Sequence, residues 1–61
     1  MCGQILFNHI TKRLSVYTYL NKTKRSFDIL NQDLASIYQN AIVDFEINEN
    51  DEACLIEITA L

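Results

Sequence analysis

Two cysteines and one histidine are the residues of this chain best suited to nucleophilic or metal chemistry. Cys2 and Cys54 lie near opposite ends of the 61-residue sequence, and His9 is its one histidine. Structural zinc sites usually hold four ligands in short paired spacings such as C-x₂-C, which these residues do not match. The sequence also lacks a Gly-rich phosphate loop, H-E-x-x-H and a Ser, His and Asp grouping. We therefore expect no metal, no cofactor and no catalytic residues, with His9 surface-exposed or hydrogen-bonded.

The chain opens with Met1, Cys2 and Gly3, and removal of Met1 would leave Cys2 as the terminal residue. This opening resembles the start of the N-terminal-nucleophile glutamine amidotransferases. The resemblance implies a terminal thiol that attacks an amide with its own amine as base. It covers three residues, and those enzymes have a far larger sandwich fold, so we expect this chain not to be an enzyme.

The redox state of these cysteines depends on the cellular compartment in which the protein is located. The N-terminus lacks the signal-peptide pattern of a charged n-region, an apolar h-region and a small-residue cleavage site. Reduced thiols in a cytoplasmic protein are therefore the expectation, because disulfides persist mainly in oxidising compartments. A disulfide between Cys2 and Cys54 remains the alternative.

Aromatic and basic residues form a second group with possible function. Tyr17 and Tyr19 share one face of a predicted strand. The nearby basic residues are Lys12, Arg13, Lys22, Lys24 and Arg25. Aromatic rings on a sheet flanked by cations are typical of single-stranded nucleic-acid binding. Alternatively, the tyrosines pack under the helix and the basic residues lie in solvated turns.

The charges are divided along the chain. All five basic residues precede Ser26, and all eight acidic residues follow it, for a net charge of −3. Nonspecific polyanion binding by the whole molecule is therefore not expected, and only the N-terminal half suits it. Three interpretations of the acidic residues are open. They form a solvated sheet face, they complement a basic partner, or they meet the basic half of a second copy of the chain.

Residue patterning predicts the first strands. Residues 14–20 form the clearest one, with Leu14, Val16, Thr18 and Leu20 on one face. Neither of its faces is clearly polar, which indicates a central strand or a strand that meets a partner. Residues 3–10 fit both a strand and a helix, and β-branched and aromatic content favours the strand.

One helix is expected within residues 27–41. A helix beginning at Ser26 would point Ile29 away from the apolar stripe, so we assign residues 27–30 to a strand end. Asn31 is then the N-cap, Asp33 lies in the first turn, and the helix ends near Asn40. Its expected core-facing residues are Leu34, Ile37, Tyr38 and Ala41.

The C-terminal third predicts a β-hairpin. Residues 41–47 alternate, with Phe45 inward and Asp44 and Glu46 outward, and an acidic turn at 48–52 follows. The second strand places one set of side chains on the core face: Cys54, Ile56, Ile58 and Ala60.

The chain should form a single domain, residues 1–61, of the α+β class: a small antiparallel sheet of four to five strands with one short helix packed on one face. Its 49% hydrophobic content is enough for it to fold. No segment approaches the roughly 20 apolar residues that span a bilayer, so no membrane association is expected.

The sequence predicts a small non-enzymatic interaction protein that binds and regulates or inhibits a protein partner, with a homodimer as the expected assembly. Its partner-binding residues would be Asp44, Glu46, Glu49, Asp51, Glu52, Tyr17 and Tyr19. The alternative is a single-stranded nucleic-acid-binding module that uses the tyrosines and the basic N-terminal half. Compact acidic chains without catalytic residues are typical of phage or mobile-element accessory factors. This origin is an expectation from the class of protein and does not rest on any particular residue.

Overall fold

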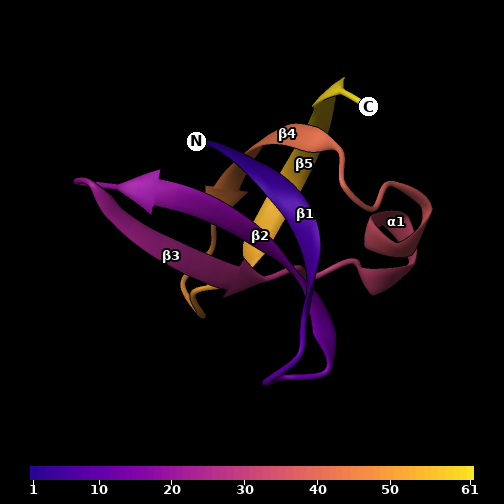
Figure 1. Ribbon diagram of the computed structural model, residues 1–61, viewed down its shortest axis with the longest axis horizontal. Helices are drawn as coiled ribbons and strands as arrows, with labels where there is room; N and C mark the ends of the chain where they lie inside the picture. Colours follow the sequence, from indigo (N-terminus) through magenta and orange to yellow (C-terminus); the bar gives the residue numbers. More distant parts are fainter.

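The computed structural model describes all residues, 1–61, as one curled sheet with one short helix (Figure 1). The elements are β1 (Cys2–Asn8), β2 (Arg13–Leu20), β3 (Thr23–Asp28), α1 (Gln32–Ile37), β4 (Ile42–Ile47) and β5 (Ala53–Ala60). The sheet has five strands in the order β3-β2-β1-β4-β5, and every neighbouring pair is antiparallel. The predicted small α+β fold is confirmed, and the ambiguous N-terminal segment is a strand. The helix is too short to cross a membrane.

The two edges of the sheet meet at one point. Ile29, just beyond β3, forms an isolated parallel bridge with Ala53, the first residue of β5. The Leu30 N–H donates to the Ala53 carbonyl at 3.0 Å, and the Ile29 N–H donates to the Leu14 carbonyl at 3.2 Å. In Figure 1, β5 crosses the direction of β1 and β2, as expected for a strongly curled sheet. The result is a partly closed barrel.

Apolar side chains from the strands, from α1 and from the segments that flank it fill this barrel. Val16 on β2 pairs with Phe27 on β3, and the Phe27 and Phe45 ring centroids are 6.5 Å apart. The buried core consists of Ile5, Leu14, Val16, Phe27, Ile29, Ala35, Ala41, Val43, Phe45 and Ala53.

Gly3 lies where β1 packs tightly against β2. A Cβ atom there would be 2.6 Å from the Tyr17 carbonyl oxygen and 2.7 Å from Val16 Cγ2. Real Cβ atoms do not approach a backbone oxygen so closely. Packing therefore explains the chain's one glycine.

Helix α1 begins as predicted but is rotated and shorter. Asn31 is the N-cap, and its Oδ1 accepts from the Leu34 N–H at 3.1 Å. The helix ends at Ile37, not near Asn40. The prediction that Ile37 faces the core is wrong, because this residue is 72% exposed and Ala35 is buried instead.

The Gln32 side chain explains this rotation. Its Oε1 accepts from the Leu14 N–H at 2.9 Å, and its Nε2 donates to the carbonyls of Leu14 at 2.9 Å and Ile29 at 2.7 Å. These bonds fix the first turn of α1 against β2. Ala35, three residues after Gln32, then faces the core, and Ile37 lies on the other side of the helix.

The pairing of strand β5 departs from the predicted alternation near the start of the strand. Cys54 pairs with exposed Glu46, whereas Ile58 pairs with buried Val43. Cross-strand partners lie on the same face, so Cys54 and Ile58 lie on opposite faces. The predicted core face is therefore wrong for Cys54, whereas Ile56 and Ile58 pack against the core as predicted. A register shift between these pairs accounts for it, and Leu55 within the shifted segment has a φ of 50°.

Leu55 should show the cost of its backbone conformation. The left-handed region costs an L-residue roughly 1–2 kcal/mol, and glycine avoids this cost. We expect Leu55→Gly to be more stable than Leu55→Ala by about 1 kcal/mol in urea unfolding. Glu57, exposed on the same strand, is the control, since Glu57→Ala should be more stable than Glu57→Gly. The same order at both positions would contradict the left-handed Leu55.

Candidate functional site

Two tyrosines and a lysine lie together on the outer face of β2 and β3. Val16 and Thr18 are buried, so the alternating Tyr17 and Tyr19 project outward. Tyr19 is 74% exposed, and Tyr17 is half-buried. Lys24 is the cross-strand partner of Tyr19, and its Nζ lies 5.5 Å from the centroid of the Tyr17 ring. We call Tyr17, Tyr19 and Lys24 the tyrosine face.

The hairpin tip adds one more cation near this face. Asn21 and Lys22 form a two-residue turn, with φ of 53° and 67°. Positive φ at both positions is the geometry of type I′ hairpin turns, which match the twist of their strands. Lys22 therefore lies in the turn that joins β2 to β3, two residues before Lys24 in the sequence.

The other basic residues are distributed elsewhere. Arg13 lies at the opposite end of β2, and its Nε is 3.6 Å from Asp28 Oδ2. Lys12 lies in the turn between β1 and β2. Arg25 projects from the other face of β3, with its Cζ 5.2 Å from the Phe27 ring centroid. The structure thus joins only part of the predicted basic set to the tyrosines.

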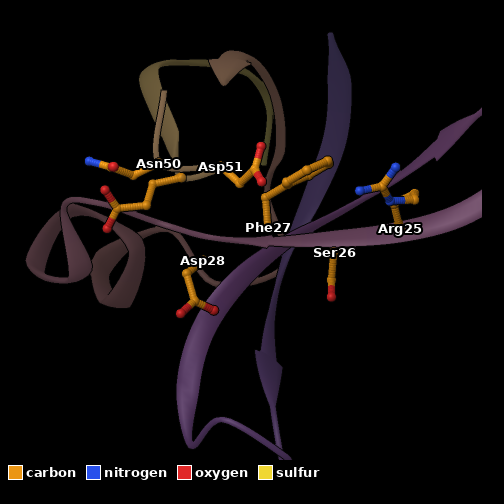
Figure 2. Close-up of a pocket in the computed structure, with 7 residues that line it drawn as sticks. Arg25, Ser26, Phe27, Asp28, Asn50 and Asp51 are labelled. Carbon is orange, nitrogen blue, oxygen red and sulfur yellow. The ribbon is translucent and has the colours of Figure 1, made fainter. Parts of the chain in front are cut away.

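An open groove lies between β3 and the β4–β5 turn. Figure 2 shows Arg25 and Phe27 projecting from one face of β3, whereas Ser26 and Asp28 point the other way. Asn50, Asp51 and Glu52 line the opposite wall of this groove of about 540 Å³. The groove is mostly polar and brings the two oppositely charged halves of the chain together.

The acidic turn is organised by Asn48. Its Oδ1 accepts from the N–H groups of Asn50 and Glu52, each at 2.9 Å. Its Nδ2 donates to Glu52 Oε1 at 3.2 Å. The carboxylates of Glu49 and Asp51 are exposed in this turn.

Acidic side chains also line the outer face of β4 and β5. Glu46 is exposed, and Asp44 lies directly opposite Glu57. The Met1 amine is 3.0 Å from Asp44 Oδ1. No lysine or arginine occurs after Arg25, so neither strand supplies a basic side chain. We call Asp44, Glu46 and Glu57 the acidic face.

The cysteines and histidine do not converge. Cys2 begins β1, and His9 follows its other end, where its ring lies edge-on to Phe7 at 4.9 Å. Both thiols are free, so the alternative of a disulfide is wrong. No three His, Cys, Asp or Glu residues are close enough to hold a metal ion.

Sequence reasoning missed an apolar groove beside β5. Leu30 and Leu34 form one wall, and Leu55 and Ile56 form the other. Cys54, Leu55 and Ile56 are three consecutive apolar residues in a strand that otherwise alternates. This run was the available signal, because an extra residue in the alternation indicates a bulge.

Comparison of the chain with protein-family models, curated proteins and solved structures gives no match.

Proposed function

We propose that this protein binds single-stranded nucleic acid on the tyrosine face. The observation that carries the proposal is the position of Lys24, beside exposed Tyr19 and over the ring of Tyr17. The exposed Tyr19 ring and the half-buried Tyr17 ring can each stack a base, while the Lys24 ammonium group beside them can neutralise a phosphate. This preference reverses the order of the two sequence-based hypotheses.

The strand arrangement supports this proposal by analogy. Partly open barrels of five antiparallel strands, such as the OB-fold, bind oligonucleotides across the face of their second and third strands. The tyrosine face lies on the second and third strands of this barrel. Fold alone does not determine function, so the side chains carry the argument.

The charge distribution favours binding of the nucleic acid on the tyrosine face. The acidic face lies on β4 and β5, and β1 separates these strands from β2 and β3. Phosphates would be repelled from the acidic face and attracted to Lys22 and Lys24. A net charge of −3 is therefore compatible with local binding.

Binding of a labelled oligothymidine of about ten nucleotides, followed by fluorescence anisotropy, tests the proposal. Tyr19→Ala should weaken binding by about 1–3 kcal/mol, the value of one base–aromatic stack. Lys24→Gln should reduce the slope of log K against log[salt] by about 0.7, because one phosphate contact is lost.

Lys12→Gln is the matched control, since it removes the same charge from a turn outside the tyrosine face. Its salt slope should equal that of the wild type. Absence of binding at low salt, or equal effects of the two lysine substitutions, would rule out the tyrosine face as the binding site.

A second candidate function is self-association, or binding of another protein, through the acidic residues, with regulation or inhibition of the partner. The observation that favours it is the direct opposition of Asp44 and Glu57. Like charges directly opposite each other destabilise a sheet. The Met1 amine, 3.0 Å from Asp44 Oδ1, offsets part of this repulsion. Glu46 and Glu57 on the same face have no basic side chain beside them, so an incoming cation would pair with these two carboxylates. In a homodimer, the exposed basic residues of β3 in a second copy supply the cation.

Sedimentation equilibrium at low and high salt tests this dimer. The variant replaces Asp44 and Asp51 by Asn and Glu46, Glu49 and Glu52 by Gln. We expect the wild type to dimerise at low salt and dissociate at high salt, and the variant to remain monomeric, because screening and neutralisation remove the same attraction. Identical association of both proteins would exclude the acidic residues from the interface.

A further inference from the structure

The apolar groove beside β5 is separate from the tyrosine face and from the groove of Figure 2. It has a volume of about 140 Å³ and lies between β5 and the segment that leads into α1. Leu30 is 56% exposed and Leu55 is 76% exposed. These two leucines present apolar surface on opposite walls, which is the form of a site for an apolar side chain.

Leu55 is unusual in its backbone as well as its exposure. Its φ of 50° is rare for a bulky residue, and the bulge holds it in that conformation within a strand. Neither the exposure nor the conformation stabilises the fold. Such residues cluster at functional sites, where the surrounding structure imposes a conformation that binding uses.

The backbone of β5 is also open beside this groove. Strand β5 pairs with β4 on one side, and on the other side only Ala53 is bridged, to Ile29. Residues 54–60 therefore have an edge without a neighbouring strand. Unpaired N–H and C=O groups at such an edge form a template to which an extended segment can add as a further strand.

The charges around the groove define the partner. Asp33 lies in the first turn of α1, Glu46 lies opposite Cys54, and Glu57 lies on β5 itself. No basic side chain occurs in this half of the chain. A second copy docking the same surface about a two-fold axis would bring like charges together, which disfavours self-pairing here. A segment with basic flanks would complement these carboxylates.

We propose that the groove and the free edge of β5 bind an extended segment of another protein, with alternating apolar side chains flanked by lysine or arginine. An apolar side chain of this segment occupies the space between Leu30 and Leu55, and its backbone pairs with β5. The proposal uses neither Tyr17 nor Lys24, so it stands independently of nucleic-acid binding.

The probe is a short synthetic peptide that alternates valine with threonine and carries lysines at both ends. A second peptide has the same centre and glutamates at both ends. In an NMR titration of the ¹⁵N-labelled full chain, the lysine peptide should shift the amides of β5 and of residues 30–34. The glutamate peptide should bind at least about tenfold more weakly, because its charges repel Asp33 and Glu57.

Leu55→Ser should weaken binding of the lysine peptide about tenfold, the effect of truncating an interface anchor. Ile10→Ser is the control, since Ile10 is 93% exposed in a turn remote from the groove. Leu30→Ser, on the opposite wall, provides the same test if Leu55→Ser fails to fold. The proposal is overturned if the lysine peptide does not bind at about 1 mM. Equal binding of the lysine peptide to the wild type and to whichever of Leu55→Ser and Leu30→Ser folds would also overturn it. Amide shifts confined to the turn at 48–52 would do the same.

Discussion

Ile29 and Ala53 meet where the two edges of the curled sheet touch, and both side chains are fully buried. The Leu30 N–H donates to the Ala53 carbonyl there, so the contact includes a directional hydrogen bond as well as apolar burial. Without this contact the sheet would be open, and the inner face of β3 would lose its cover. A chain of this size buries only about 60% of its surface on folding, so the loss of one core contact removes a large share of its stability.

The closing bridge also divides the surface of the molecule. On one side of it, Arg25 of β3 faces the acidic turn across the polar groove; on the other, Leu30 and Leu34 face β5 across the apolar groove. Exposed Tyr19 and half-buried Tyr17 lie on a third surface. Exposed Tyr19, left-handed Leu55 and the opposed Asp44 and Glu57 all depart from what folding alone favours. Such local departures are expected at functional sites.

Local patterns predicted most of the secondary structure. The β-branched and aromatic run of β2, the alternation of β4 and the Asn31 cap each depend on neighbouring residues. The rotation of α1 could not be predicted, because it depends on contacts of Gln32 with the distant Leu14 backbone. The bulge at Leu55 is indicated only by the apolar run of Cys54, Leu55 and Ile56, and the bridge at Ile29 involves one residue, which leaves no periodic signal. For the candidate site, the sequence predicted the types of residue involved. It did not predict which of these residues lie together, because that depends on the curvature of the sheet.

Native-state hydrogen exchange at the Leu30 amide tests the closing bridge most directly. If the bridge holds the barrel together, this amide opens only with global unfolding. Its exchange free energy should then match that of the Ile5 amide, which donates to the Ala41 carbonyl between β1 and β4, and should fall with denaturant at the same slope. Exchange through a low-energy opening with little dependence on denaturant would show that the two edges separate without unfolding, which contradicts the account.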